Sequence, residues 1–181
     1  SDKIKQLEYD FFMDLCNTIA QQVASVQATA EAVAQLDVLC SFAEVAVRND
    51  YCMPEIDASG ELIIRQGRHP VVEQTLSDVA LVPNDTQLNC EGNRVAIVTG
   101  PNMAGKSTYM RQTALITLMA QTGSFVPAKS AVIGVVDRVF TRIGASDDLA
   151  SGQSTFMLEM SEVANILSHA TERSLLILDE I

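Results

Sequence analysis

One short segment has the residue types and spacing of a phosphate-binding loop. Residues 100–107, Gly-Pro-Asn-Met-Ala-Gly-Lys-Ser, match the pattern GxxxxGK[ST]. Glycines in such a loop let backbone N–H groups turn toward phosphate oxygens, and the helix that follows presents its positive end to them. The positively charged Lys106 side chain would contact the β- and γ-phosphates, and the Ser107 hydroxyl would ligate Mg²⁺. The alternative is a glycine-rich turn from a strand to a helix that binds no ligand.

A second segment ends in two adjacent carboxylates. The apolar run Leu175–Leu178 is followed by Asp179 and Glu180. At the end of a buried strand, Asp179 would hold Mg²⁺, directly or through water, and Glu180 would polarise the attacking water. Buried strands often end in acidic residues, so the pattern is weak alone and strong beside a phosphate-binding loop. An acidic pair favours an ABC-type ATPase, in which Glu is the base, over a small GTPase, in which Gln positions the water.

A third segment, Ser151-Gly-Gln-Ser-Thr-Phe156, lies between these two motifs and opens a predicted helix. Small hydroxyl-bearing residues at a helix N-terminus either bind an anion or only cap the helix. The position of this turn between the two motifs favours phosphate binding.

Alternating strands and helices are predicted to position these motifs. Short apolar, β-branched runs predict five strands, and apolar residues at helical spacing predict two helices. The predicted strands are Leu62–Arg65, Arg94–Thr99, Val132–Val136, Arg138–Ile143 and Ser174–Leu178, and the helices are Ser107–Thr122, closed by Gly123, and Phe156–Leu167. This order predicts an α/β fold with a central, largely parallel sheet over residues 51–181. Together with the phosphate-binding loop and the acidic pair, it leads us to expect a P-loop NTPase domain of the ABC type.

Residues 1–50 form a separate segment in this interpretation. No Gly or Pro occurs before Pro54, and apolar residues recur at three- or four-residue steps. The pattern predicts one helix over residues 3–48, about 70 Å long at roughly 1.5 Å per residue. The alternative, a helical hairpin, would need a turn signal near residue 28, and the sequence has none there. We expect a long helical lever or connector segment that precedes the α/β domain.

Composition excludes several classes of protein. Twelve basic and 23 acidic residues give a net charge of −11, so the bulk surface is not expected to bind polyanions. No apolar run is long enough to span a membrane, and the N-terminus lacks a basic region followed by an apolar one, so secretion is not expected. The cysteines include no CxxC pair and are expected to be reduced thiols in the cytoplasm; they are Cys16, Cys40, Cys52 and Cys90. His69, beside Pro70, is expected to be structural, and His169 to lie on the surface or cap a helix.

Longer runs of sequence around the motifs carry a more specific resemblance than the motifs alone. They are Thr99–Gln112, Gly123–Ala128, Phe140–Arg142, Asp147–Met157, Gly67–Pro70 and Leu81–Asp85. Together these runs closely resemble the bacterial MutS family of DNA mismatch-repair ATPases. The resemblance is dense over residues 54–181, and residues 4–50 resemble the lever helix of the family. It implies that ATP and ADP, with Mg²⁺, are the cofactors and that ATP binding and hydrolysis switch a dimeric DNA clamp.

The resemblance also implies a role for individual residues. The nucleotide would be sandwiched across a head-to-tail dimer of two ATPase domains, with Ser154 contacting the γ-phosphate in the partner subunit. Leu81 and Val82 would pack against adenine, although the family often has an aromatic residue at the position of Leu81. The remaining nucleotide-binding residues would be Gly100, Pro101, Asn102 (near the γ-phosphate), Met103, Ala104, Gly105, Lys106, Ser107 and Thr108. Glu180 would be catalytic, and Ser107 and Asp179 would hold the metal.

The family's other functional parts are expected to lie outside this chain, which looks like a fragment. Mismatched DNA would bind through domains before residue 1, a downstream repair factor is an expected partner, and no membrane is involved. The isolated chain is expected to be inactive. One alternative is another ABC-class ATPase, which predicts an LSGGQ-like signature that Ser151–Phe156 does not match. The other is a nucleotide-dependent interaction module of a MutS-like paralogue.

Overall fold

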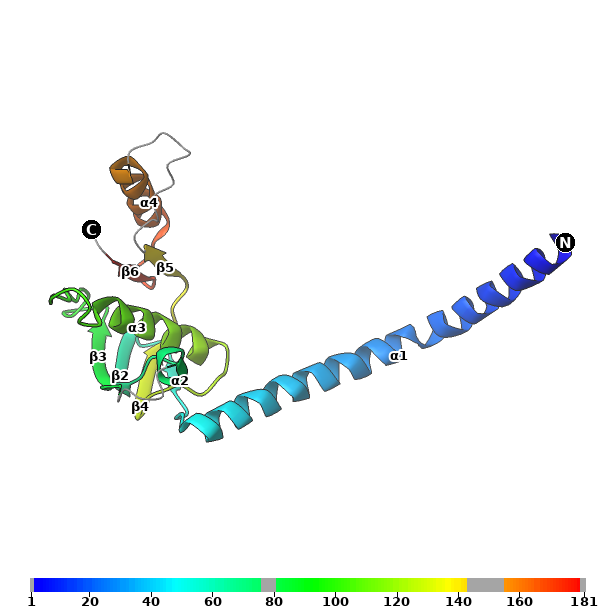
Figure 1. The fold of residues 1–181 in the computed structure, drawn as a ribbon, viewed down its shortest axis with the longest axis horizontal. Helices are drawn as coiled ribbons and strands as arrows, with labels where there is room; N and C mark the ends of the chain where they lie inside the picture. Colours follow the sequence, from blue (N-terminus) through cyan, green and yellow to red (C-terminus); the bar gives the residue numbers. More distant parts are fainter. Residues whose placement is uncertain (1, 76–80, 143–154, 180–181) are drawn as a thin grey trace. The chain divides into compact units, whose positions relative to one another are not determined.

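The structure, a computed structural model, describes residues 2–75, 81–142 and 155–179 (Figure 1). The chain divides into two compact units, residues 1–44 and residues 45–181. The division falls inside the first helix, so the last turn of that helix belongs to the second unit.

Helix α1 spans Asp2–Asn49 without a break and confirms the long helix predicted over residues 3–48. The helical hairpin is therefore excluded. The helix ends where Asp50 adopts a left-handed backbone (φ 53°) and the Tyr51 N–H donates to the Ala46 carbonyl at 3.0 Å. This is the geometry of a Schellman cap, here made without glycine. Ala46 is the only buried residue of α1, and most of the large apolar side chains of this helix are exposed.

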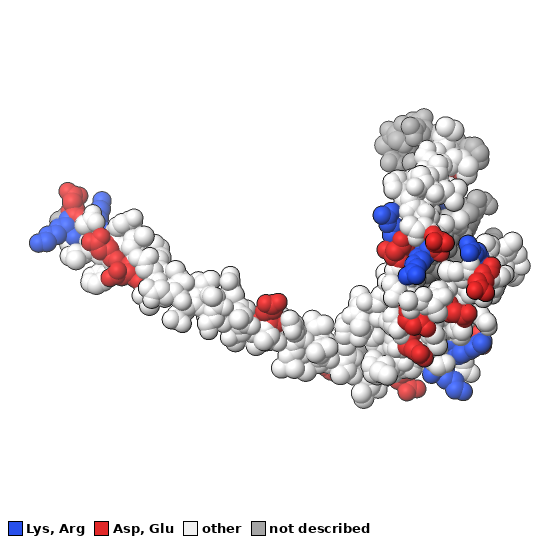
Figure 2. All heavy atoms as spheres, turned by 180° about the vertical axis from the view of Figure 1, so that it is seen from behind, with Lys and Arg blue, Asp and Glu red and all other residues white. Residues whose placement is uncertain are grey.

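Charges are unevenly distributed along the chain. Residues 15–30 of α1 contain no Asp, Glu, Lys or Arg, and the corresponding stretch of surface is white in Figure 2. On the face of the second unit drawn there, basic and acidic side chains are interspersed. The basic side chains of this face are not gathered into one patch.

The main sheet has four strands in the order β1-β4-β2-β3. They are β1 (Glu55–Asp57), β2 (Glu61–Gly67), β3 (Asn84–Asn89) and β4 (Ser130–Gly134). β4 is parallel to β1 but antiparallel to β2, and β2 is antiparallel to β3. A separate pair, β5 (Val139–Arg142) and β6 (Leu175–Leu178), is parallel. The described sheet is therefore mixed, and the prediction of a largely parallel central sheet is wrong for these residues.

The predicted strand Arg94–Thr99 is also wrong, because residues 93–100 are irregular. The side chains of Val95 and Ile97 are 77% and 85% exposed, although their types favour a buried strand. A strand forms only where a neighbour completes its backbone hydrogen bonds, and no described strand pairs with this segment. The sheet instead gains β1 and β3, whose polar sequences gave no strand signal.

Two longer helices flank the motifs, and a short one follows β2. α2 spans Val72–Thr75, α3 spans Lys106–Gln121 and α4 spans Thr155–His169, so both predicted helices are confirmed to within two residues. Gly123 (φ 87°) lies just past the end of α3. α3 packs on the sheet through a core whose most buried members are Ile64, Ile116, Val126 and Ile133, each 0% exposed. No described helix is long and apolar enough to cross a membrane.

Candidate functional site

A pocket of about 570 Å³ lies at the N-terminal end of α3. Its lining comes from the segment before β3 and the start of β3, from the irregular segment before the glycine-rich loop, from the end of that loop, and from the first half of α3. The lining residues are Leu81, Val82, Asn84, Asp85, Val98, Thr99, Ala104, Gly105, Lys106, Thr108, Tyr109 and Gln112. The structure thus brings the two predicted adenine contacts together with part of the predicted phosphate loop.

The loop leaves the N-terminus of α3 open to a ligand. Gly105 is the N-cap residue, with a left-handed backbone (φ 86°), and no side-chain hydrogen bond caps the helix among the described residues. Met103 is also left-handed (φ 62°) and its side chain is fully exposed. Because uncapped first-turn N–H groups carry partial positive charge, this end of α3 has the donors that a phosphate needs.

Lys106, the first residue of α3, folds back over the loop. Its Nζ donates to the carbonyl of Gly100 at 2.7 Å and to that of Pro101 at 3.0 Å. Ser107 and Thr108 are half-buried in the first turn, whereas Asn102 is exposed. The two carbonyls hold the ammonium group beside the loop, where an incoming phosphate could replace them. The donor set therefore fits a phosphate group.

The opposite wall of the pocket is tied to α3 by hydroxyl groups. The Tyr109 hydroxyl donates to the Asp85 carbonyl at 3.3 Å and accepts from the Thr86 hydroxyl at 3.1 Å. Gln112 is 1% exposed, and its Nε2 has no hydrogen-bond partner among the described residues. Sequence reasoning did not single out Tyr109 or Gln112 as site residues. Tyr109 lies three residues after Lys106 and Gln112 lies three residues after Tyr109, so each is a neighbour of the one before it on the surface of α3, but this spacing alone does not indicate which residues face a pocket.

Asp85 stays ionised at this wall. A backbone N–H from Gln66, 2.8 Å from Oδ1, and the Arg65 guanidinium, 3.0 Å from Oδ2, hold the pKa of the carboxyl below its ordinary value. The interaction fixes the wall to the end of β2.

Asp179, a predicted metal ligand, is buried directly after β6 but is not among the described residues that line the pocket. Its N–H donates to the Arg142 carbonyl at 2.9 Å, and its carbonyl accepts from Arg142 Nη1 at 3.0 Å. The buried Arg142 side chain also pairs with Glu159 (2.5 Å) and, more weakly, with Glu162 (3.8 Å) of α4. The strand end is therefore fixed to α4.

The other predicted metal ligand, Ser107, supplies a hydroxyl oxygen. One hydroxyl and one carboxylate are oxygen ligands suited to Mg²⁺, which keeps several waters and uses few protein groups. In the described ranges, no three His, Cys, Asp or Glu residues gather as a metal cluster. The predicted catalytic Glu180 and the predicted trans contact Ser154 lie outside the described residues.

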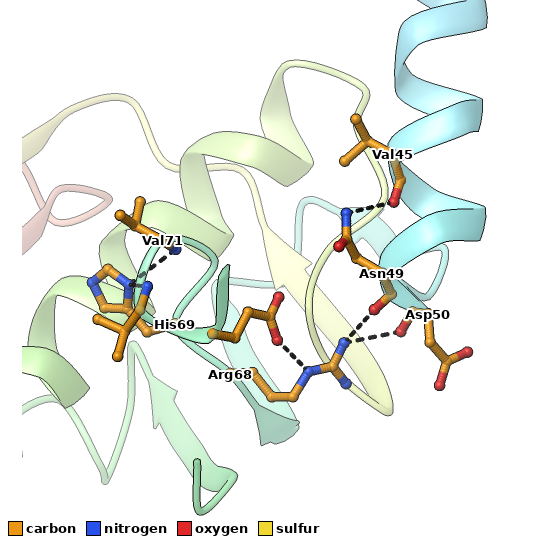
Figure 3. Close-up of polar contacts among 8 residues, drawn as sticks. Val45, Asn49, Asp50, Arg68, His69 and Val71 are labelled. Carbon is orange, nitrogen blue, oxygen red and sulfur yellow. Dashed lines mark hydrogen bonds and ion pairs between the residues drawn. The ribbon is translucent and has the colours of Figure 1, made fainter. Parts of the chain in front are cut away.

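His69 has a structural position, as predicted. Its Nδ1 accepts the N–H groups of Val71 and Val72, each at 3.3 Å, at the start of α2 (Figure 3). Burial lowers the pKa of the imidazole, so the neutral form that accepts these bonds is favoured. His69 is not among the described residues that line the pocket.

Comparison with known proteins extends over the whole chain. Residues 96–181 match the family model for MutS domain V. The chain is 62% identical to the DNA mismatch repair protein MutS of Acetivibrio thermocellus and 64% identical to that of Ruminiclostridium cellulolyticum, in each case over 99% of this chain and 21% of the relative. It is 58% identical to the protein of the same name from Methanosarcina mazei, over 100% of this chain and 20% of that relative. The chain therefore spans about a fifth of the length of these relatives.

Proposed function

Since this chain belongs to the MutS family, we propose that it is the ATP-binding and ATP-hydrolysing part of a DNA mismatch repair protein. The observation that carries the proposal is the pocket at the N-terminus of α3. There the uncapped helix end and Lys106 meet Leu81 and Val82, the two residues expected to contact adenine.

The pocket suggests how the nucleotide would bind. Its phosphates would lie at Gly100–Ser107, where Lys106 exchanges the carbonyls of Gly100 and Pro101 for phosphate oxygens. The base would contact Leu81 and Val82 through apolar surface. Ser107 and Asp179 would hold Mg²⁺, which supplies charge neutralisation at the phosphates.

Hydrolysis would need groups from two subunits. Glu180 would accept a proton from the attacking water, and Asn102 would approach the γ-phosphate within the same subunit. Ser154 of the partner subunit would complete the site in a head-to-tail dimer. Closure of this dimer would favour ATP over ADP and so drive the switching of a DNA clamp.

Calorimetry with Mg²⁺-ATP tests the binding step. We expect weak binding by the 181-residue chain, and at least about tenfold weaker binding by Lys106→Ala, because a charge-assisted bond to phosphate is worth 1.4 kcal/mol or more. Lys129→Ala is the matched control, since Lys129 is exposed and is not among the described residues lining the pocket. Equal heats for the intact chain and Lys106→Ala would overturn the proposal.

A gain of affinity tests the base contact separately. Leu81→Phe would restore the aromatic residue that the family often has, and base–aromatic stacking contributes about 1–3 kcal/mol. We expect at least about fivefold tighter ATP binding by Leu81→Phe. An unchanged or weaker affinity would place the base elsewhere.

Steady-state turnover tests the catalytic step. The chain alone should hydrolyse ATP negligibly, because the trans contact requires a correctly placed partner. Steady turnover by the isolated chain that Glu180→Gln abolishes would refute this requirement while supporting Glu180 as the base.

A further inference from the structure

One arginine holds the C-terminal end of α1. Arg68 Nη2 donates to the carbonyls of Asn49 at 2.8 Å and Asp50 at 3.1 Å (Figure 3). The last carbonyls of a helix have no intrahelical donors and carry partial negative charge, so a guanidinium is a well-matched partner. Arg68 thus completes the cap that Asp50 and Tyr51 begin.

The guanidinium group is itself fixed in place. Its Nε donates to Glu73 Oε2 at 2.7 Å in a pair whose side chains are 23% and 15% exposed. The Tyr51 ring lies 5.9 Å from the guanidinium carbon, within range of a cation–π contact. Burial, followed by interaction with Glu73, raises the pKa of Tyr51 to about 12. The Tyr51 phenol therefore stays neutral through the physiological pH range.

The residues just before Arg68 contact the pocket wall and α3. The Gln66 N–H donates to Asp85, which lines the pocket, and Gln66 has a strained left-handed backbone (φ 50°) at an irregularity in the β2–β3 register. Gly67 packs against α3 so tightly that an added Cβ would lie 2.8 Å from Gln112 Nε2. The Arg68 N–H donates to the Pro127 carbonyl at 2.8 Å.

We propose that Arg68 is the positioning residue through which nucleotide binding in the pocket changes the anchoring of the end of α1. Three successive residues make the connection: Gln66 contacts the pocket wall, Gly67 contacts the helix that carries Lys106, and Arg68 contacts the end of α1. Because Gly67 lies against Gln112 with no room for a side chain between them, we expect a shift of α3 to be transmitted to the segment that bears Arg68. The inference rests on the proposed function, since it takes ATP as the ligand of the pocket.

Hydrogen exchange on the 181-residue chain, with and without Mg²⁺-ATP, tests the coupling. The readout is the exchange of amides 46–51, above all the Tyr51 N–H that bonds to the Ala46 carbonyl. We expect ATP to change this exchange rate by about fivefold or more, the lower end of ordinary coupling between sites. In Arg68→Ala the amides should exchange faster, and the ATP-dependent change should be lost.

A matched control separates this role from arginine capping in general. Arg138 donates to the His169 carbonyl at the end of α4 at 3.1 Å and makes no described bond to α1. Arg138→Ala should keep the full ATP-dependent change at residues 46–51. Because coupling is reciprocal, Arg68→Ala should also alter ATP affinity by the factor lost from the exchange response.

The outcomes distinguish this inference from the proposed function. If the intact chain binds ATP in calorimetry but amides 46–51 do not respond, or respond equally in Arg68→Ala, the inference fails and the proposed function stands. If the intact chain does not bind ATP, both fail. Should Arg68→Ala not fold by circular dichroism, Arg68→Lys replaces it; because lysine lacks the two-pronged donor, a full ATP response in that variant would likewise overturn the inference.

Discussion

Replacing Gly67 by alanine should destabilise the second unit through a single methyl group. The added Cβ would lie 2.8 Å from Gln112 Nε2, 2.8 Å from Ile64 Cγ2 and 3.2 Å from Ile116 Cδ1. Contacts under 3.0 Å are far inside van der Waals distance, so at least two neighbours must move. Ile64 and Ile116 are 0% exposed, and Gln112 is 1% exposed, so none has open space to enter.

The expected magnitude follows from this crowding. Overpacking a tight core by one methyl group costs about 1–3 kcal/mol, and the branched Ile64 cannot move its Cγ2 by a simple rotation at the chain end. For a chain of this size, each kcal/mol lowers the Tm by about 2–4 °C. We therefore expect Gly67→Ala to melt about 2–12 °C below the unmodified chain.

Thermal melting, with urea titration at 25 °C, measures the effect. Gly92→Ala is the matched control, because an added Cβ there meets nothing within 4 Å, and its stability should change by less than about 1 kcal/mol. Gln112→Ala in the Gly67→Ala background should recover part of the loss, giving a favourable coupling of about 0.5 kcal/mol or more. If Gly67→Ala were as stable as Gly92→Ala, β2 and α3 would not be packed as described.

Three further predictions concern caps and buried charge. Because burial lowers the pKa of His69, the unfolded chain binds more protons than the folded chain, and the Tm should fall as the pH is lowered from about 7.5 to about 5.5. His69→Asn, whose side-chain oxygen can accept the same N–H bonds, should reduce this fall in Tm. An unchanged fall in His69→Asn would assign the pH dependence to other groups. Asp50→Gly should stabilise the chain to urea by about 1 kcal/mol by relieving a left-handed aspartate. Asp37→Gly within α1 should instead destabilise it by roughly a few tenths of a kcal/mol, because glycine is the poorer helix former, and equal signs for the two changes would contradict the capping geometry. Arg142→Met should cost about 3 kcal/mol in urea unfolding, because it leaves Glu159 beside a buried site without its partner, and a loss no larger than that of the exposed Arg138→Met would refute the ion pair.

Helices were the part of the fold that periodicity could predict. α1 has no Gly or Pro to interrupt it, and α3 begins after a loop whose glycines indicate a turn. The sheet was harder, because strand formation depends on distant partners. Asn84–Asn89 pairs with β2 although its sequence is mostly polar, whereas the apolar Arg94–Thr99 finds no described partner and stays irregular.

The candidate site likewise has some residues that the sequence could predict and others that it could not. The loop residues and Lys106 were predictable, because contiguous residues bind phosphate through their own backbone. The resemblance also placed Leu81 and Val82 at the pocket that the structure describes. Asp85, Tyr109 and Gln112 were not singled out, because their contacts join β3 to α3 and no local pattern encodes such a contact. The arrangement of Arg68 with the end of α1 was missed for the same reason.

The central place of β4 has a consequence for the order of folding during synthesis. β4 lies between β1 and β2, yet β1 ends at Asp57 and β4 begins only at Ser130. As the chain leaves the ribosome, α1 can form from local contacts, and β2 can pair with β3 as soon as Asn89 has emerged. β1 must wait for β4; until β4 is made β2 has an open edge, and until α3 is made the apolar residues Leu62 and Ile64 of β2 are not covered by that helix. The nascent sheet is therefore most exposed to mispairing and chaperone capture while the glycine-rich loop and α3 are being made, and the insertion of one strand ends that period.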